Sequence, residues 1–419
     1  MTGREKTSDV FAPITQQMDE IRRDAAEIIP EDDLVRKLER SLARNEPLRV
    51  KQGFDPTRPD LHIGHAVSMR KLRTFQQLGH EVIFVVGDYT ARVGDPSGRS
   101  EARPKLSPAE IDANARTYAD QVSSILDVSK VRVEFNSKWL APLDLAGILE
   151  LTATYTVARM LERDDFAKRY QENRPISIME FMYPLMQAYD SVALNADVEL
   201  GGTDQKFNLL VGRTVQERYG QEPQVCLIMP LLRGTDGDAK MSKSYGNYIG
   251  LTEPPEEQYG KTMSIPDALL EEWYELASLL PPAELAVARE LVRSNPYQAK
   301  RELAAAIART YHGDDGARRA AEHFDRVFKQ KAAPDDLPVV AVSLSDPALR
   351  GNENGVSLVG LLVVTGLAGS NTEAVRLIQD GSVAVDGEKH RDRHTYVSTD
   401  RDHVLRKGSR HYVKVTFIP

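Results

Sequence analysis

The chain has almost no cysteine and no long hydrophobic run. Cys226 is the single cysteine among 419 residues, so a scaffold of disulfide bonds within the chain is excluded. Its neighbours in the string VCLIMP are apolar, which favours a small buried side chain. We recognise no signal peptide and no apolar run long enough to span a membrane. We therefore expect a cytoplasmic protein with no membrane partner.

An excess of positive charge is absent as well. The chain carries 54 Lys and Arg against 62 Asp and Glu, which gives a formal net charge of −8. A uniformly basic nucleic-acid binder is therefore excluded, and any nucleic-acid surface must be a local patch. A hydrophobic content of 41% and a charged content of 28% are typical of a soluble globular protein. The length of 419 residues predicts two or three domains.

The stretch 48–65, LRVKQGFDPTRPDLHIGH, predicts a strand, a turn and the start of a helix. Apolar residues continue at helical spacing as far as Leu78, and Gly79 then ends the helix. A second strand follows at residues 81–88, EVIFVVGD. A strand, a helix and a strand within about 40 residues form a βαβ unit, which makes a parallel sheet.

Two histidines stand at the start of this predicted helix. His62 and His65 share one helix face, and Gly64 between them lets another molecule approach the backbone. A helix N-terminus offers unpaired N–H groups to a phosphate, and two imidazoles could add hydrogen bonds in its transition state. The alternative is a pair of surface histidines on an ordinary helix. We do not expect a metal site, because no cysteine or third histidine lies nearby in the sequence.

The loop after the second strand, TARVGDPSGRS, lies where ligands bind in open α/β sheets, beyond the carboxyl ends of the strands. Asp88 and Asp95 are candidates for binding a substrate ammonium group. The alternative for Asp95 is that it only initiates a turn with Pro96.

Two later strings carry polar side chains that could line a pocket. Tyr183, Gln187 and Asp190 are spaced to form one stripe of a helix, which predicts either a pocket wall or a structural hydrogen-bond network. The string GGTDQKFN repeats the order of strand, glycine turn and helix. Its glycines let a ligand approach the backbone closely, and Asp204 and Gln205 could hydrogen-bond that ligand.

The string AKMSKS, residues 239–244, predicts a mobile cationic loop. Lys240 and Lys243 could reach a triphosphate, and Ser242 and Ser244 could add hydrogen bonds. Taken alone, such a string is more often a solvated charged loop. It follows the last predicted strand of the sheet, however, so it can lie over the same sheet edge as the two histidines.

The two phosphate motifs together resemble those of a class I aminoacyl-tRNA synthetase: HIGH at 62–65 and KMSKS at 240–244. The strings GFDPTRPDLHIGH, GDPSGRS, QAYDS and GGTDQ closely resemble those of bacterial tyrosyl-tRNA synthetases, and the likeness extends from about residue 31 to the C-terminus. The resemblance implies an α/β fold. Its expected parts are a Rossmann-like doubly wound parallel sheet with an inserted helical segment, then an α-helical domain and a small α+β RNA-binding domain.

The resemblance and the composition together predict a domain order. We expect an N-terminal extension (1–30), a catalytic nucleotide-binding domain (31–250) with a dimer-forming insertion at about 136–195, a helical anticodon-recognition domain (251–335), a linker (336–354) and a small RNA-binding domain (355–419) similar to a ribosomal small-subunit protein. Within these, residues 19–29 and 296–330 predict single helices.

The last predicted domain carries the local basic patch. Residues 389–414 hold eight Lys or Arg against three acidic residues, which fits contact with a phosphate backbone. A solvated β-domain surface is the alternative. The residues that we expect to bind tRNA are Arg391, Arg393, Arg406, Lys407 and Arg410.

The resemblance implies a two-step reaction with L-tyrosine, ATP and the tRNA for tyrosine. The tyrosine carboxylate attacks the α-phosphorus of ATP, and the activated tyrosine then passes to the 3′ end of the tRNA. Magnesium is expected with ATP, held mostly by phosphate oxygens, and no tightly bound cofactor is expected. The family is homodimeric, so we expect a homodimer, and we expect no DNA partner.

The resemblance also assigns site residues. Asp190 is expected to accept a hydrogen bond from the tyrosine hydroxyl. The expected catalytic residues are His62, His65, Lys240, Lys243 and Thr57; the expected ATP-binding residues are Asp55, Gly64, Gly202, Asp204, Met241, Ser242 and Ser244; the expected tyrosine-binding residues are Asp95, Tyr183, Gln187, Asp190, Gln205 and Gly53.

The chain departs from the best-known branch of the family at Lys51, where that branch has a tyrosine that helps to bind the substrate hydroxyl. A second bacterial branch also has lysine there. A buried lysine without a partner is costly, so we expect Lys51 to be paired or turned away. Three alternatives remain open: a tryptophanyl-tRNA synthetase, a small-molecule nucleotidyltransferase, and an RNA-binding paralogue without catalytic activity.

Overall fold

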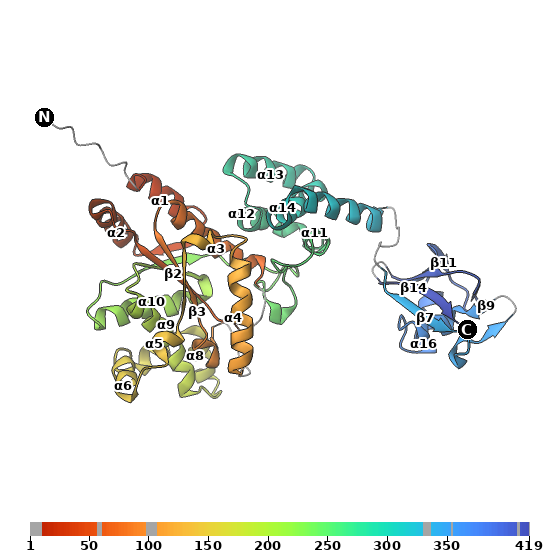
Figure 1. The fold of residues 1–419 in the computed structure, drawn as a ribbon, viewed down its shortest axis with the longest axis horizontal. Coiled ribbons are helices and arrows are strands. Elements are labelled where there is room, and N and C mark those ends of the chain that lie inside the picture. The colour runs from red at the N-terminus through yellow and green to blue at the C-terminus, as the bar shows by residue number, and fades with distance from the viewer. Residues whose placement is uncertain are drawn as a thin grey trace. The chain divides into compact units, whose positions relative to one another are not determined.

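The computed structural model describes residues 11–56, 61–97, 107–329, 337–352, 355–408 and 411–418 (Figure 1). The chain forms two compact units, Met1–Gly313 and Asp314–Pro419. The first unit is built on an α/β sheet, and the second unit on a smaller, mostly antiparallel sheet. Each unit is described separately below.

The first unit contains a six-stranded sheet with the strand order β1-β6-β5-β2-β3-β4. The strands are β1 Glu27–Ile29, β2 Arg49–Phe54, β3 Glu81–Val86, β4 Val131–Phe135, β5 Val198–Gly202 and β6 Val225–Met229. Strands β2 to β6 are parallel, and β1 pairs with β6 in the antiparallel sense. The strand order reverses between β2 and β5, and this reversal is where a doubly wound sheet opens a crevice for ligands.

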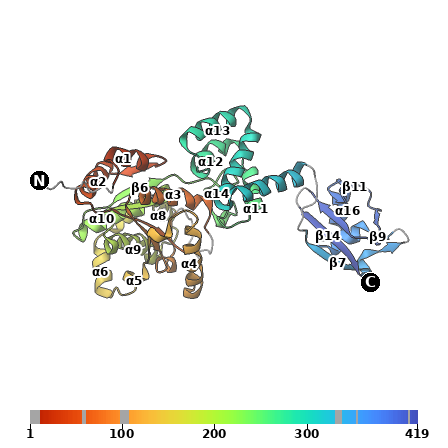
Figure 2. The ribbon, with the colours of Figure 1, turned by 45° about the horizontal axis from the view of Figure 1, so that its top comes forward.

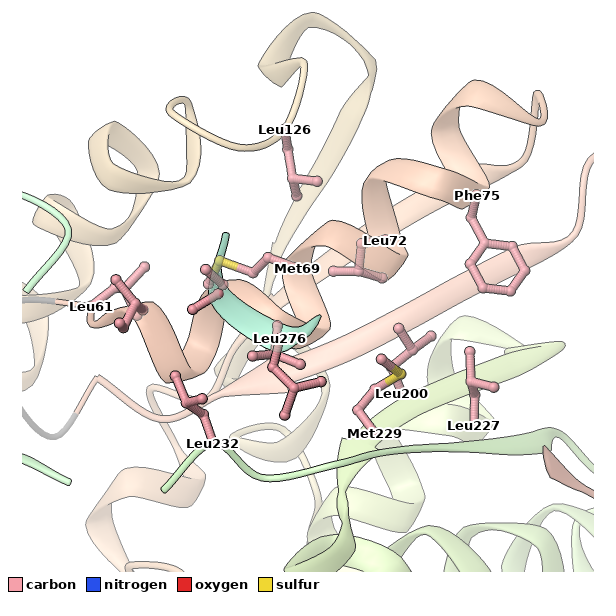
Figure 3. Packing of buried hydrophobic residues seen from close by; sticks show 14 of the residues in the cluster. Leu61, Met69, Leu72, Phe75, Leu126, Leu200, Leu227, Met229, Leu232 and Leu276 are labelled. Atoms are coloured by element: carbon pink, nitrogen blue, oxygen red, sulfur yellow. The ribbon is translucent and has the colours of Figure 1, made fainter. Parts of the chain in front are cut away.

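Helix α3 (Ile63–Gln77) connects β2 to β3 and completes the predicted βαβ unit. Its apolar side chains, among them Leu72 and Phe75, are fully buried. Figure 3 shows these side chains packed with Leu200 of β5, Leu227 of β6 and further core residues. Burial of each such side chain contributes about 1.5–3 kcal/mol, so this packing holds α3 firmly against the sheet.

The N-terminal segment differs from the prediction of one helix over 19–29. The structure has helix α1 at Ile14–Arg22 and strand β1 at Glu27–Ile29. Asp24 adopts a left-handed conformation with φ of 60°, which breaks the helix between these two elements. Because β1 pairs with β6, residues 27–29 belong to the six-stranded sheet rather than to a separate extension.

Helices account for most of the remaining first unit, and the segment between β4 and β5 is helical as predicted. The helices up to β6 are α2 Glu31–Arg44, α4 Pro108–Val122, α5 Ser137–Leu140, α6 Leu145–Ala153, α7 Val157–Met160, α8 Asp164–Gln171, α9 Ile178–Leu194 and α10 Lys206–Arg218. Helices α9 and α10 pack against each other beside the sheet (Figure 2).

The helices after residue 250 share their core with the sheet. They are α11 Pro255–Met263, α12 Leu270–Ala277, α13 Pro282–Ser294 and α14 Pro296–Phe324. Leu276 of α12 belongs to the same hydrophobic cluster as the α3 side chains (Figure 3). The long helix predicted over 296–330 is interrupted, because Gly313 has φ of 70° and ψ of −179°, which is not helical.

Beyond the end of α14, the described residues of the second unit form a five-stranded sheet with the order β11-β10-β13-β14-β7 and two α-helices. Its main elements are β7 Val339–Ser343, α15 Leu358–Val364, α16 Asn371–Gln379, β10 Val383–Val385, β11 Glu388–His390, β13 His403–Lys407 and β14 His411–Ile418; the short strands β8 Gly351–Asn352, β9 Gly355–Ser357 and β12 Tyr396–Val397 form a separate sheet. The predicted order of helix, glycine turn, helix and hairpin is therefore present.

The stretch 336–354, which was predicted to be a linker, is partly structured. Strand β7 lies in this stretch and pairs in parallel with β14 at the edge of the sheet. The prediction relied on the Pro and Asp content of residues 331–338 and missed the apolar string VVAVS that follows. In the part of the chain that the structure describes, no helix is both long and apolar enough to cross a membrane.

Candidate active site

A cavity of about 770 Å³ lies at the carboxyl ends of β2 and β5, where the strand order reverses. Its lining includes all the residues that were predicted to bind phosphate or amino acid, except Asp88 and Thr57; Thr57 lies outside the described residues. These are Gly53, Asp55, His62, Gly64, His65, Asp95, Tyr183, Gln187, Asp190, Gly202, Asp204, Gln205, Lys240, Met241, Ser242, Lys243 and Ser244. Segments that are far apart in the sequence are thus brought to one place.

The two histidines occupy the start of α3. The backbone N–H of His62 donates to His65 Nδ1 at 3.2 Å, and the ring centroids are 3.8 Å apart. Burial lowers the pKa of His65 to about 4 and that of His62 well below its usual value, with the nearby lysines lowering both further. Both rings are therefore neutral at physiological pH. Because His65 Nδ1 accepts a hydrogen bond, its proton is on Nε2, where it is available to a ligand.

The glycine in this motif is closely packed. A Cβ atom at Gly64 would lie 3.0 Å from His62 Nδ1 and 3.5 Å from the Met241 Cβ. Any larger side chain at this position would therefore be in tight contact with the His62 ring.

The loop 239–244 is anchored by its backbone. Met241 N–H donates to the Leu232 carbonyl at 2.8 Å, and Ser242 N–H donates to Asn247 Oδ1 at 2.8 Å. Asn247 is itself buried. The ammonium group of Lys240 forms an ion pair with Asp204, which follows β5. The loop is thus held at the cavity by its backbone, and the Lys240 side chain is directed toward the end of β5.

Gly202, at the end of β5, packs closely against Leu231 and Asp204. A Cβ atom there would lie 2.6 Å from Leu231 Cδ2 and 2.7 Å from Asp204 Oδ1, so no larger residue fits without displacement. At Gly53, on β2, a Cβ atom would meet nothing within 4 Å and would project into open space. Both glycines leave backbone exposed to the cavity.

The opposite end of the cavity contains a buried carboxylate. Asp190, on α9, is 3% exposed and accepts hydrogen bonds from Trp139 Nε1 at 2.8 Å and from Asn136 Nδ2 at 3.4 Å. Burial raises the pKa of Asp190 to about 7, against the opposing effect of the Lys51 ammonium group and these two donors. A carboxylate in this position can accept a hydrogen bond from a polar group deep in the cavity.

Tyr183 connects α9 to the end of β2. Its hydroxyl donates to Asp55 Oδ2 at 2.9 Å, and the hydroxyl of Thr90 donates to Asp55 Oδ1 at 2.7 Å. Asn136 Nδ2 in turn donates to the Thr90 hydroxyl at 3.0 Å. Asp55 is therefore tied to the same network as the buried Asp190.

A chain of amides occupies the wall between these two ends. Gln205 Nε2 donates to Asp95 Oδ2 at 2.7 Å, and Asn208 Nδ2 donates to Gln205 Oε1 at 3.2 Å and to Gln187 Oε1 at 3.0 Å. The guanidinium of Arg163 lies 3.7 Å from Asp95 and donates to Asn208 Oδ1. The carboxylate of Asp95 is thus oriented before any ligand enters.

Comparison with known protein families gives two matches along the chain. The model of the class I tRNA synthetases for tryptophan and tyrosine matches residues 43–329. The chain belongs to this family. The model of a tyrosine–tRNA ligase C-terminal domain matches residues 339–415. Two successive segments of the chain therefore match models of synthetase domains.

Individual relatives and solved structures of synthetases agree with these matches. The chain is 53% identical over 405 residues to the tyrosine–tRNA ligase of Moorella thermoacetica, covering 96% of each chain. It is 50% identical over 407 residues to that of Geobacter sulfurreducens, covering 96% of this chain and 99% of the relative. A crystal structure of the Archaeoglobus fulgidus tyrosyl-tRNA synthetase complexed with L-tyrosine covers 74% of this chain and all of its own, with a TM-score of 0.60 and 26% identity.

The structure decides two expectations for this synthetase. Asp88 accepts a hydrogen bond from the Ser137 backbone N–H at 2.9 Å and does not line the cavity, so it is not a ligand for a substrate ammonium group. Lys51 is buried and paired, with its Nζ atom 2.9 Å from Glu199 Oε1. The expectation that Lys51 is paired or turned away is confirmed in its first form.

Sequence reasoning missed several residues that support the cavity. They are Asn136 and Trp139 after β4, Arg163 in the helical insertion, Glu199 in β5 and Asn208 in α10. Two signals could have found some of them. Asn136 and Trp139 follow a strand at the same sheet edge as the other site residues, and Glu199 is a charged residue between the apolar Val198 and Leu200 of a predicted strand.

The predicted tRNA-binding residues belong to the second unit. Arg391 and Arg393 are exposed and follow β11, whereas Arg406 and Lys407 lie on β13 and are half-buried. Lys407 forms an ion pair with Glu373 at 3.0 Å, and Arg391 lies against the turn at Gly381. Arg410 lies outside the described residues. Across the described ranges, no three His, Cys, Asp or Glu side chains come together as a metal site.

Proposed function

We propose that the chain attaches L-tyrosine to its tRNA in two steps, through a tyrosyl-adenylate, by the residues of this one cavity. The observation that carries the proposal is the composition of the cavity wall. It combines two neutral histidines and two lysines at one end with a buried carboxylate at the other. The first set suits a triphosphate, and the second suits a substrate that ends in a hydroxyl group.

In the first step, an oxygen of the tyrosine carboxylate forms a bond to the α-phosphorus of ATP. The bond from that phosphorus to the bridging oxygen breaks, and pyrophosphate leaves. His62 and His65 donate neutral hydrogen bonds to the phosphates, while Lys240 and Lys243 compensate the charge that develops on them. Thr57 assists near the γ-phosphate. Mg²⁺ enters with ATP as part of the substrate and is held mainly by phosphate oxygens.

The nucleotide binds along the open backbone of the cavity. Gly64 and Gly202 allow close approach, and Asp55 lines the approach to the nucleotide. Asp204 exchanges its ion pair with Lys240 for a contact with the substrate when the phosphates arrive. The loop residues Met241, Ser242 and Ser244 complete the nucleotide site.

The tyrosine side chain extends to the buried end. Its hydroxyl donates a hydrogen bond to Asp190, and its ammonium group binds Asp95, Tyr183 and Gln187, with Gln205 nearby and Gly53 under the ring. A site that pairs a substrate hydroxyl rejects an analogue without it, since the buried acceptor would lose its partner. Rejection of phenylalanine therefore needs no editing domain.

Transfer to tRNA requires the rest of the chain. We propose that residues 251–335 contact the anticodon region, and that Arg391, Arg393, Arg406, Lys407 and Arg410 contact phosphates of the cytoplasmic tRNA. The exposed basic residues of the second unit support the latter contact.

We propose that the enzyme is a homodimer. Large apolar side chains are exposed on the helical insertion, including Leu145 (72%), Leu149 (59%), Val157 (62%) and Ile178 (81%). Several large apolar side chains left exposed on one inserted segment favour a protein interface. Sedimentation at micromolar concentration is expected to give a dimer, and a Leu145→Asp, Leu149→Asp variant is expected to give a monomer. A monomeric unsubstituted protein would contradict the proposal.

Pyrophosphate exchange with purified protein tests the activity. We expect exchange between ATP and labelled pyrophosphate with tyrosine and not with tryptophan or phenylalanine. Exchange with tryptophan would overturn the assignment of the amino-acid site while leaving the mechanism intact. Failure of all three amino acids to support exchange would indicate an RNA-binding paralogue that has lost catalysis.

A further inference from the structure

Lys51 forms a buried ion pair directly behind the amino-acid site. It lies on β2 opposite Glu199 on β5, and both side chains are only 1% exposed. The ammonium Nζ donates to Glu199 Oε1 at 2.9 Å and to the main-chain carbonyl of Gln187 at 3.3 Å. Lys51 does not itself line the cavity, so any effect on substrate must pass through its neighbours.

The partner carboxylate is fully hydrogen-bonded. Glu199 Oε1 accepts from Lys51 and from Gln187 Nε2 at 3.0 Å, and its Oε2 accepts from Ser191 Oγ at 3.3 Å and from Gln224 Nε2. A buried ion pair offsets its desolvation only when the geometry is good and the remaining lone pairs are satisfied. Glu199 meets this condition, with donors from β2, from α9 and from Gln224, which precedes β6.

One consequence concerns the orientation of Gln187. Lys51 holds its main-chain carbonyl, and Glu199 holds its side-chain Nε2. The remaining oxygen, Oε1, accepts from Asn208. The amide of Gln187, which lines the cavity, is thus fixed at each of its ends by groups that never touch the substrate.

A second consequence concerns charge at Asp190. Two buried carboxylates, Asp190 and Glu199, share the positive charge of Lys51. Burial raises the pKa of Asp190 to about 7; Lys51 opposes this rise, and Glu199 adds to it. The other groups that face Asp190 are the uncharged donors Trp139 and Asn136, so its ionisation depends on the charges in β2 and β5.

We propose that Lys51 is a positioning residue for tyrosine: through its ion pair with Glu199 it fixes Gln187 and supplies the buried positive charge that keeps Asp190 an ionised acceptor for the substrate hydroxyl. The inference rests on the proposed role of Asp190. It gives the lysine at this position a function without any contact between the lysine and the substrate.

A purely structural ion pair makes a different prediction. Loss of such a pair would lower the free energy of unfolding, yet the folded protein would bind tyrosine with an unchanged Kd and an unchanged pH dependence. In the positioning role, the positive charge of Lys51 lowers the pKa of Asp190 and the negative charge of Glu199 raises it. Removal of one charge must therefore shift the titration of Asp190 in the opposite direction to removal of the other.

The test measures the Kd of L-tyrosine by equilibrium dialysis between pH 5.5 and 9 in four proteins. In Lys51→Met, the midpoint of the titration is expected to rise by about one to two pH units, and Kd at pH 7 to increase about tenfold or more. In Glu199→Gln, the midpoint is expected to fall below that of the unsubstituted protein. The double variant removes one charge of each sign and is expected to return the midpoint toward its original value.

A matched control is Lys37→Met. Lys37 is also a lysine buried to 1% exposure, and it is paired with Asp197 at 3.5 Å, outside the cavity. It is expected to lose stability without any change in the tyrosine titration. If Lys51→Met does not fold, Glu199→Gln and the double variant still test the proposal, because their midpoints must differ from each other.

Two measurements separate this inference from the proposed function. Pyrophosphate exchange that proceeds normally while the Glu199→Gln and double-variant midpoints stay at the original value would overturn the role of Lys51 and leave the function standing. Tyrosine binding that titrates as expected without any exchange would overturn the function and leave the role of Lys51 standing.

Discussion

The two ends of the cavity are built on different physical principles. At the amino-acid end, Asp190 and Tyr183 are buried, and each is hydrogen-bonded to a side chain from another part of the chain. At the phosphate end, the Lys240 side chain is 38% exposed and Ser244 is exposed, both on one loop that is anchored by its backbone. A network that is fixed in advance favours binding of the ground state. A half-exposed cation that must first break its ion pair, as Lys240 must with Asp204, favours the transition state, in which negative charge develops on the phosphates.

The charge states of the two ends differ as well. The histidines are held neutral, since burial lowers the pKa of His65 to about 4. Asp190 has a pKa of about 7 and therefore titrates in the physiological range. Substitutions at the phosphate end should therefore change kcat, whereas substitutions at the amino-acid end, or changes in pH, should change the KM for tyrosine.

The largest expected effect is that of Lys243→Ala. We expect kcat for pyrophosphate exchange to fall by about 100- to 1,000-fold, because a preorganised group that stabilises transition-state charge contributes that much. The KM for tyrosine should change by less than about twofold, because the lysine does not contact the amino-acid end. The measurement is steady-state exchange kinetics with each substrate varied in turn.

Lys261→Ala is the matched control for this substitution. Its ammonium group lies 5.1 Å from the Tyr248 ring centroid, and that of Lys243 lies 5.8 Å from the same centroid, yet Lys261 does not line the cavity. We expect kcat to be nearly unchanged in the control. A rise in tyrosine KM in Lys243→Ala as large as the fall in kcat would erase the distinction between the two ends.

The next largest effect is expected from Asp190→Asn. A hydrogen bond to a charged group contributes about 1.5–3 kcal/mol, so kcat/KM for tyrosine should fall by about 10- to 150-fold. Phenylalanine serves as the internal control, because it makes no hydroxyl contact and its weak activity should change little. Equal losses for tyrosine and phenylalanine would show that Asp190 supports the fold of the site rather than reading the hydroxyl.

The phosphate end could be predicted from the sequence because each of its motifs is one continuous string. HIGH occupies a single helix turn and KMSKS a single loop, so spacing alone places their side chains together. The amino-acid end was only partly readable. Lys51 and Glu199 are 148 residues apart in the sequence, and Trp139 reaches Asp190 from a third segment. Only the register of the strands and the packing of α9 bring these groups together.

The fold divides in the same way. The βαβ unit of β2, α3 and β3 was predictable, because its periodicity, glycines and cap signals agree with one another. Strands β1 and β7 were missed, since short edge strands are selected by the neighbour they pair with rather than by their own pattern. The break at Gly313 was missed because one glycine within a helical sequence costs only about 1 kcal/mol and need not end the helix.

The pH dependence of the unsubstituted protein should separate the two ends without any mutation. Asp190 is protonated below its pKa of about 7 and then is a poorer acceptor for the substrate hydroxyl. The KM for tyrosine should therefore fall by about tenfold as pH rises from 6 to 8. Over the same range kcat should stay nearly flat, because the histidines already remain neutral. A kcat that rises through pH 6 to 7 would mean that a histidine titrates there.

The smallest expected effect comes from Trp139→Phe, and it sharpens the comparison most. The substitution removes the Nε1–H that donates to Asp190 Oδ1 at 2.8 Å and leaves a smaller aromatic ring in place. Loss of this donor should raise the pKa of Asp190. The KM for tyrosine at pH 7 should therefore increase by about three- to tenfold, with kcat unchanged. Trp273→Phe is the matched control, because Trp273 is buried and its Nε1 has no hydrogen-bond partner among the described residues. Any change in tyrosine KM that the two variants share reflects packing, and only the excess in Trp139→Phe measures the hydrogen bond. If the two KM values are equal, the donor does not help to hold Asp190, and the amino-acid end is less preorganised than its hydrogen bonds indicate.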